Sequence, residues 1–146
     1  MRIAVIAVGK VKQRGLRVEL DDYFSRVRRY AGCDEIELKD GSEREVVARF
    51  ERAIPERARV VALEVGGKAL DSHGLARVVD QCEQGAVPVL AFLIGGAYGL
   101  PPQLSRRADM RLSLSAMTLP HRIARLVLAE QIYRAFTILR NEPYSH

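Results

Sequence analysis

The sequence contains no tryptophan, only two cysteines and only three histidines. Cys33 and Cys82 are far apart and form no C-x-x-C pair, so the sequence indicates neither a disulfide framework nor a thiolate metal site. His73, His121 and His146 are equally scattered, and no H-E-x-x-H segment occurs. We therefore expect two reduced, mostly buried cysteines and no bound metal.

Long hydrophobic runs are also missing, and no stretch approaches the roughly 18 apolar residues that a membrane span needs. The apolar start, residues 1–10, is too short to span, and no small-residue cleavage pattern follows it. A buried first strand accounts for it better than a signal peptide does. The sequence therefore predicts a cytoplasmic protein.

What the chain does have is enough apolar residues for one core. Hydrophobic residues make up 48% of its 146 residues and charged residues 28%, which is typical of a single globular domain. Lys and Arg number 23 against 18 Asp and Glu, giving a net charge of +5. This balance suits a polyanionic partner such as nucleic acid, although on its own it does not identify one.

Short apolar runs, each followed by a loop, predict buried strands at residues 3–8, 60–65, 87–94 and 110–115. At residues 35–38, Ile36 and Leu38 alternate with charges, which predicts an edge strand. Helical patterns separate these segments. Strands that alternate with helices predict one α/β domain over residues 1–146, with a mostly parallel sheet covered by helices on both faces.

The helices have recognisable starts and ends. The first carries an apolar stripe, and the second opens with a capping box of Ser42 and Glu45 and ends at Pro55. Ser72 is expected to cap the third, which Gly85 ends. Pro101 or Pro102 begins a short fourth helix, and a fifth runs over about residues 120–140.

The last predicted helix is apolar on nearly every side. Ile123 and Val127 project to one side, whereas Leu128 and Ile132 project roughly opposite. Such a helix needs cover all round, and a chain this short supplies one layer. We therefore expect a second subunit to supply the other, with Ile132 and Phe136 at that contact.

Ligands of open α/β sheets bind beyond the carboxyl ends of the strands, where this sequence places three suggestive loops. They are residues 66–68, 95–102 and 116–121. A Walker A motif is excluded because Ala62 stands where its first glycine belongs and Ala69 replaces its Ser or Thr. No Rossmann G-x-G-x-x-G follows the first strand, and no G-x-S-x-G indicates a serine hydrolase.

The segments at residues 93–96, 99–100 and 112–121 together carry a resemblance. Leu-Ser-x-x-Thr-Leu-Pro-His following a Gly-Gly loop resembles the bacterial large-subunit rRNA pseudouridine N3-methyltransferase family, of the SPOUT class. The likeness continues through residues 125–135 and 141–144 and covers essentially the whole chain. In that family the C-terminal Tyr is followed directly by His, whereas here Ser145 separates Tyr144 from His146.

The resemblance implies a fold with a trefoil knot in its C-terminal half, and a homodimer. It implies that the substrate is a pseudouridine of the large-subunit rRNA, presented by the assembled ribosome. It also implies S-adenosylmethionine (adenosylmethionine below) as cofactor. The residues that would contact this cofactor are Leu63, Gly95, Leu114, Ser115, Ala116, Met117, Thr118 and Leu119.

Ring nitrogen 3 of a pseudouridine carries a proton that must leave, so a base or a group that stabilises the developing anion would help. Tyr144, His146 and Arg125 are the catalytic candidates, and His121 and Glu130 are further possibilities. For Glu130 an ion pair with the residue at i+4, an arginine, is the more ordinary interpretation.

Two alternatives stay open. The chain could be a non-catalytic RNA- or ribosome-binding module on the same scaffold, or a SPOUT enzyme of another specificity, such as tRNA ribose methylation. Basic residues of the first helix and the loop before it are hypothesised to hold RNA phosphates beside the cofactor pocket. They are Lys10, Lys12, Arg26, Arg28 and Arg29.

Overall fold

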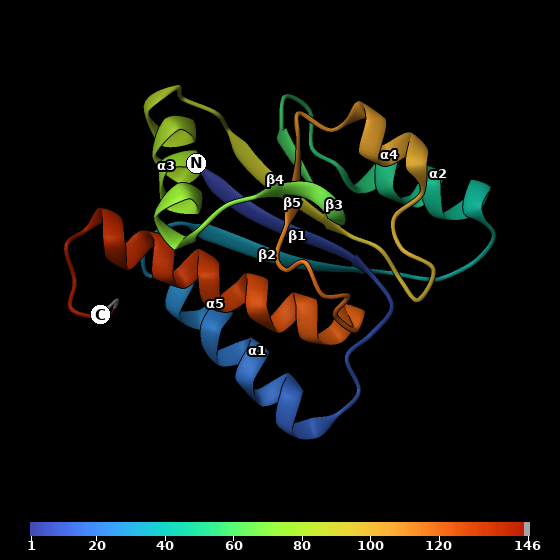
Figure 1. The fold of residues 1–146 in the computed structure, drawn as a ribbon, viewed down its shortest axis with the longest axis horizontal. Coiled ribbons are helices and arrows are strands. Elements are labelled where there is room, and N and C mark those ends of the chain that lie inside the picture. Colours follow the sequence, from blue (N-terminus) through green and yellow to red (C-terminus); the bar gives the residue numbers. More distant parts are fainter. Residues whose placement is uncertain (145–146) are drawn as a thin grey trace.

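A computed structural model of the chain describes residues 1–144. Five strands, all parallel, form one sheet in the order β2-β1-β4-β3-β5 (Figure 1). The strands are β1 (Arg2–Val8), β2 (Gly32–Leu38), β3 (Arg59–Ala69), β4 (Val89–Ile94) and β5 (Met110–Ser113). The helices are α1 (Arg14–Val27), α2 (Glu43–Ala53), α3 (Ser72–Gln84), α4 (Pro102–Arg107) and α5 (His121–Leu139).

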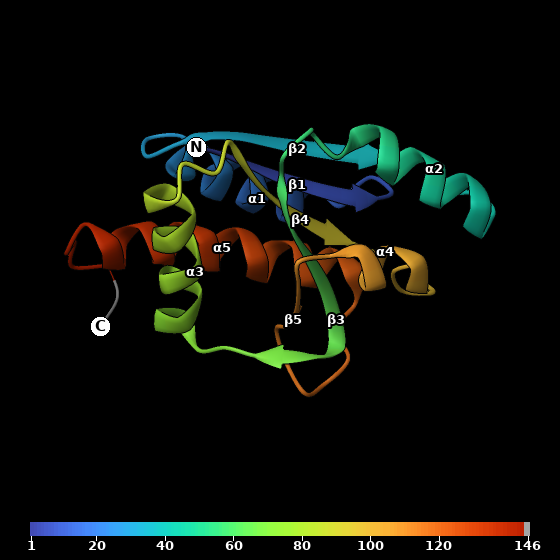
Figure 2. The same cartoon turned by 90° about the horizontal axis from the view of Figure 1, so that it is seen from above.

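Helices cover both faces of the sheet, as predicted (Figure 2). Successive residues of a strand point to opposite faces, so the fully apolar β1 feeds two cores. Ile3 and Val5 pack with α1, α3 and α5, whereas Ala4 and Ile6 pack with α2 and α4. The central strands β1 and β4 are therefore buried on both sides, and β2 is an edge strand as expected.

Two local predictions need correction. The N-cap of α3 is Asp71, whose carboxylate accepts a hydrogen bond from the Gly74 amide at 2.7 Å. Ser72 is instead the first helical residue, and its hydroxyl donates to the Gln131 side chain on α5 at 2.6 Å. The capping box at Ser42 is confirmed, with the side chain of Ser42 and that of Glu45 each bound to the other's backbone amide.

The strand β3 is longer than its apolar run, and it is irregular. Its register against β5 shifts between Leu63 and Lys68, so the four residues between them leave the regular ladder. Gly67 makes this possible, because a Cβ there would lie 2.8 Å from the backbone of Arg111. The irregularity places residues 64–67 at the carboxyl end of the sheet.

The helix α5 is covered largely by its own chain. It lies against the sheet and contacts both α1 and α3. Ile132 and Phe136 are fully buried in this core, so the expectation that they form a subunit contact is wrong. Neighbours on three sides account for much of the all-round apolar pattern.

Both cysteines are buried and unpaired, as predicted. Among residues 1–144, no helix is long and apolar enough to cross a membrane.

Candidate active site

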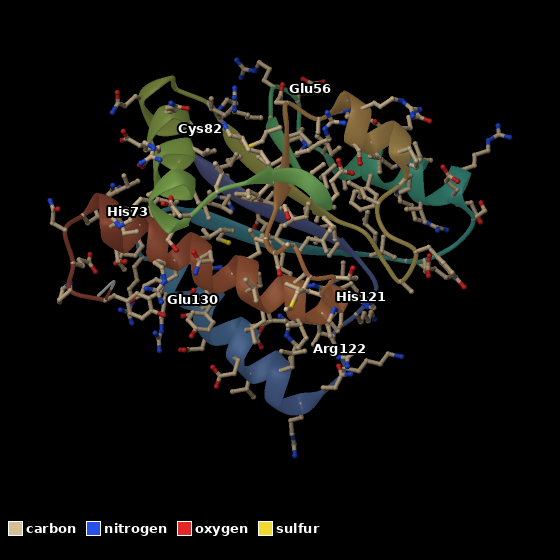
Figure 3. All side chains as sticks on the ribbon, viewed as in Figure 1. Glu56, His73, Cys82, His121, Arg122 and Glu130 are labelled. Carbon is tan, nitrogen blue, oxygen red and sulfur yellow. The ribbon has the colours of Figure 1, made fainter. Side chains whose placement is uncertain are left out.

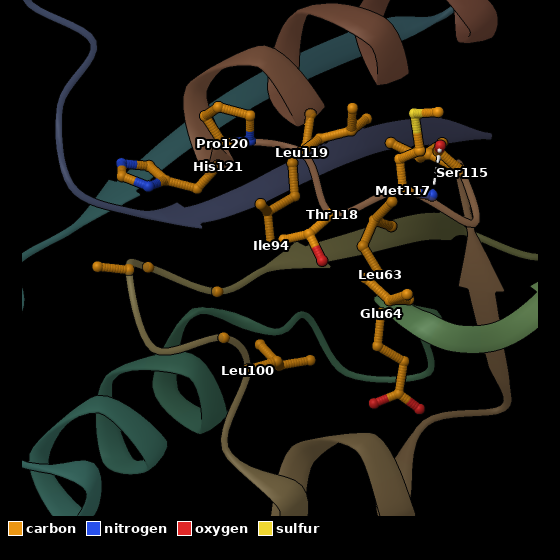
Figure 4. Close-up of a pocket in the computed structure, with 17 residues that line it drawn as sticks. Leu63, Glu64, Ile94, Leu100, Ser115, Met117, Thr118, Leu119, Pro120 and His121 are labelled. Carbon is orange, nitrogen blue, oxygen red and sulfur yellow. Dashed lines mark hydrogen bonds between the residues drawn. The ribbon is translucent and has the colours of Figure 1, made fainter.

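A cavity of about 500 Å³ lies at the carboxyl ends of β3, β4 and β5 (Figure 4). Its walls come from the middle of β3, where the register shifts, the end of β4 and the loop after it, the loop after β5 and the first turn of α5. The sequence predicts eight cofactor-binding residues, and all but Ala116 line this one cavity. The seven are Leu63, Gly95, Leu114, Ser115, Met117, Thr118 and Leu119.

Short hydrogen bonds fix the loop after β5. The Ser113 hydroxyl donates to the carbonyl of Ser115 at 3.0 Å, and the Ser115 hydroxyl accepts from the amide of Met117 at 2.9 Å. Leu114 and Leu119 contribute apolar surface to the cavity wall. The loop is thus preformed around a largely apolar hollow, which is the usual form of a small-molecule site.

Gly95 is required by the loop in which it lies. A Cβ on Gly95 would lie 2.2–2.5 Å from backbone atoms of Gly99 and Leu100. The loop folds back because the Gly99 amide donates to the carbonyl of Gly96 at 3.0 Å, with Gly99 at a φ of +82°. Gly95 was predicted to leave space for a ligand, but the space that it leaves is filled by the returning loop.

Exposed apolar side chains surround the mouth of the cavity. Val65 is 51% exposed and Met117 77%, and both line it. Tyr98 is fully exposed at the tip of the loop after β4, beside the cavity. These three are most of the large apolar side chains that the described residues expose, the fourth being Val18. Such a rim suits an apolar or aromatic ligand face.

Two ionisable side chains line the cavity, those of Glu64 and His121. The Glu64 carboxylate accepts a hydrogen bond from the hydroxyl of Ser105 at 2.9 Å, and it lies 3.7 Å from the guanidinium of Arg111. Sequence reasoning missed Glu64. The one available signal was an acidic residue directly after a buried apolar run.

Arg125 lies elsewhere, 1% exposed, in a buried ion-pair cluster. Its guanidinium donates to Glu35 at 2.9 Å, to Glu37 at 2.5 Å and to the carbonyl of Gly9 at 3.1 Å. Arg17 pairs with the same two carboxylates. Arg125 thus joins α5 to the edge strand β2 and the end of β1, and it is not among the residues that line the cavity.

Tyr144 packs against the C-terminal half of α5. Its hydroxyl donates to Glu130 at 2.7 Å, and its ring packs on Tyr133 at 4.6 Å between centroids. Glu130 also pairs with Arg134 at 2.8 Å, as predicted from their spacing. Burial and then the hydrogen bond to Glu130 raise the pKa of Tyr144, so this phenol stays protonated. His146 lies outside the described residues.

The predicted site residues therefore fall into two groups along one helix. His121 begins α5 at the cavity, whereas Glu130 lies near the middle of the helix, where the tail packs against it (Figure 3). At a rise of 1.5 Å per residue, Glu130, which the Tyr144 hydroxyl contacts, lies about 14 Å along α5 from His121, and Tyr144 is not among the residues that line the cavity.

The basic residues expected beside the pocket are divided in the same way. Lys10 and Lys12 follow β1 on the side of its carboxyl end, but Arg28 and Arg29 follow the end of α1, near the tail. Arg28 donates to the carbonyl of Cys33 at 2.9 Å, and Arg26 pairs with Asp22 at 2.8 Å.

A family model described as predicted SPOUT methyltransferase matches residues 1–146. The chain belongs to the SPOUT methyltransferase family. It is 54% identical over 146 residues to the "Ribosomal RNA large subunit methyltransferase H" of Sorangium cellulosum, covering all of both chains. It is 42% identical over 153 residues to the protein of that name from Geobacter sulfurreducens, again over all of both.

Solved structures agree on the fold. A probable methyltransferase from Bordetella pertussis matches with a TM-score of 0.60 at 12% identity, covering 92% of this chain and 95% of that one. A probable methylase family protein from Haemophilus influenzae matches with a TM-score of 0.59 at 12% identity, covering 99% of this chain and 70% of that one. At such identities these SPOUT-fold likenesses concern architecture alone.

Proposed function

We propose that this SPOUT-family chain methylates ring nitrogen 3 of a pseudouridine in large-subunit rRNA, with S-adenosylmethionine as the methyl donor. The observation that carries the proposal is the gathering of seven predicted cofactor residues around one preformed cavity. The names of the full-length relatives support rRNA as the substrate. The pseudouridine specificity rests on the family resemblance of the 112–121 segment.

The cavity fits the proposed cofactor in size and chemistry. About 500 Å³ lies within the range of small-molecule sites. Leu114, Met117 and Leu119 offer apolar surface for an adenine ring, while backbone groups of the surrounding loops are available to its polar edge. When bound, the cofactor supplies a methyl group already activated by a sulfonium, which leaves as a neutral thioether when the N–CH₃ bond forms.

The protein's own task is then to orient the uracil ring and to accept the proton that leaves nitrogen 3. The raised pKa of Tyr144 suits a neutral phenol that stacks on a base or donates a hydrogen bond, and it does not suit the proton acceptor. An imidazole is better matched to accept a proton near neutral pH. His146 in the tail and His121 on the cavity wall are the candidates.

We also propose a homodimer, because the two groups of predicted site residues do not line one cavity within a single chain. Because Tyr144 packs on the C-terminal half of α5 and does not line its own cavity, we propose that the tail of one subunit completes the cavity of the other. Arg28 and Arg29, at the same end as the tail, would then hold phosphates beside the partner's cavity. Arg125 would act on this site only indirectly, by fixing the start of α5. The trefoil knot and the cytoplasmic location are part of the same proposal.

The test is mass spectrometry of large-subunit rRNA from a deletion strain, before and after the gene is restored. We expect one methyl group on a pseudouridine to disappear and return. An unchanged methylation pattern would refute the proposed reaction. Calorimetry distinguishes the alternative, because a pure ribosome-binding module would show no saturable binding of adenosylmethionine.

A further inference from the structure

Among the described residues, 1–144, Glu64 is the only one lining the cavity that carries a carboxylate. The other walls are glycines, apolar side chains, two hydroxyls and one imidazole. The Glu64 side chain is 31% exposed. A single carboxylate in largely apolar surroundings favours a cation nearby.

The fold directs this side chain. The register shift of β3 begins after Leu63, so Glu64 is the first residue released from the ladder with β5. Figure 4 shows its side chain extending from beside Leu63 towards α4. There the hydroxyl of Ser105, a residue only 7% exposed, donates to Oε2 at 2.9 Å. The carboxylate is held in one place by a buried donor from another element.

Its negative charge is not cancelled at that place. The facing cation, Arg111, has a side chain that is 58% exposed, and its Nε is 3.7 Å from Oε1 of Glu64. An exposed pair at this distance is weak. A carboxylate offers about four lone-pair sites, and the hydrogen bond from Ser105 uses one. Glu64 therefore keeps both charge and acceptor capacity for a ligand.

We propose that Glu64 makes the cavity prefer the positively charged donor, adenosylmethionine, over its neutral thioether product, S-adenosylhomocysteine. This inference rests on the proposed function. The two ligands share adenosine, ammonium and carboxylate groups and differ by the methyl group and the sulfonium charge. A carboxylate near the sulfonium attracts the charged donor before methyl transfer. This attraction is lost with the neutral product, which therefore dissociates more readily.

The test is calorimetry of Glu64→Gln with both ligands, because glutamine keeps the shape and removes the charge. Charge-assisted contacts of this kind contribute roughly tenfold or more in affinity, so we expect the Kd for adenosylmethionine to rise by about that factor. The Kd for S-adenosylhomocysteine should change by about twofold at most, so the preference collapses. Glu64→Asp, which retains the charge, should retain most of the preference.

Glu51→Gln is the matched control. Glu51 also pairs with an arginine, Arg107 at 3.1 Å, and its side chain is similarly exposed at 38%, but it does not line the cavity. Both affinities should match those of the wild type. Ser105→Ala should shift the preference in the same direction as Glu64→Gln, by less. Thermal unfolding of each variant verifies that it is folded.

Three results would overturn the inference, and they are distinguishable. Equal weakening of both ligands would mean that Glu64 contacts the ammonium group that they share. An unchanged ratio in Glu64→Gln would mean that it senses no ligand charge. A wild-type protein that binds neither ligand would remove the proposed function together with this inference.

Discussion

The first and last turns of α5 are built differently. At the first turn, Pro120, His121 and Ala124 border an open cavity, and no side chain caps the helix. At the last turns, Tyr133 and Phe136 pack against other aromatic rings. Tyr30 stacks on Phe136 at 5.3 Å between ring centroids, and Tyr133 packs edge-on against the tail tyrosine.

The difference separates a helix end that can bind a ligand from one that fixes the position of the tail. Loops and exposed apolar side chains give the cavity end room for ligands. The tail end is instead held by stacked aromatic rings and ion pairs. Tyr30, for instance, donates a hydrogen bond to Glu142 at 2.6 Å and so fixes the chain beyond the helix. The proposed homodimer would place the tail end of one protomer against the cavity end of the other.

The largest effect is expected from the cavity end. Gly95→Ala should abolish measurable binding of adenosylmethionine, because its Cβ has no room against the backbone of Gly99 and Leu100. Calorimetry on the purified variant measures this. Gly66→Ala is the matched control, since nothing lies within 4 Å of a Cβ there although Gly66 follows a cavity residue. Wild-type affinity in folded Gly95→Ala would mean that this loop does not shape the cofactor site.

Mixing two inactive variants tests whether the cavity of one subunit and the tail of the other form one active site. Gly95→Ala lacks a working cavity and Tyr144→Ala lacks the tail ring, so each alone should methylate ribosomes poorly. An equal mixture that exchanges subunits should regain about a quarter of the wild-type sites, because half of the dimers are mixed and each has one intact combination. Single-turnover methylation measures it. A mixture as inactive as its components would show that cavity and tail act within one chain.

Arg125 should matter to stability and not to chemistry. Arg125→Met leaves Glu35 and Glu37 paired with Arg17 alone, which should cost up to about 3 kcal/mol in the free energy of unfolding. Urea unfolding at neutral pH measures it. Arg111→Met, which removes an exposed pair instead, should cost well under about 1 kcal/mol. If Arg125→Met is as stable as the wild type and binds the cofactor but no longer transfers the methyl group, Arg125 has a role in catalysis.

The smallest effect is expected at the tail end in acid. Burial raises the pKa of Glu130, but hydrogen bonds from Arg134 and Tyr144 outweigh it, and the net pKa is lowered. A lowered carboxyl pKa stabilises the fold above the unfolded value of about 4.3, and this contribution is lost as the pH falls through the folded value. Glu130→Gln should therefore flatten the dependence of the urea midpoint on pH in that acid range.

Tyr144→Phe, which removes only one of the hydrogen bonds that Glu130 accepts, should give an intermediate slope. An identical slope in wild type and Glu130→Gln would mean that this carboxylate does not stabilise the tail.

Most of the fold was predictable because its signals are local. The runs that became β1, β4 and β5 are short and continuous, and Ser42 with Glu45 marks the start of α2 without outside help. The extension of β3 carries no such signal, since Gly66 and Gly67 resemble a loop. At α3 two good capping residues stand side by side, and the sequence does not tell Asp71 from Ser72.

The site was predictable only in part, for a different reason. Its cofactor loops were found through a continuous motif, whereas the partners of Arg125 lie about ninety residues away in the sequence. Glu64 belongs to no motif, and only the register shift of β3 directs it to the cavity. A helical projection of α5 showed where apolar residues lie but not how many neighbours its own chain provides, hence the error at Ile132 and Phe136.

The strand order also bears on how the protein is made. The central strand β1 pairs with β4, and β3 pairs with β5, so each central pairing waits for a segment synthesised much later. The core on one face closes only with Ile132 and Phe136 of α5. Folding dominated by such distant pairings is slow, because loop-closure entropy is lost before the contacts form. The core on that face therefore closes only after α5 has been synthesised.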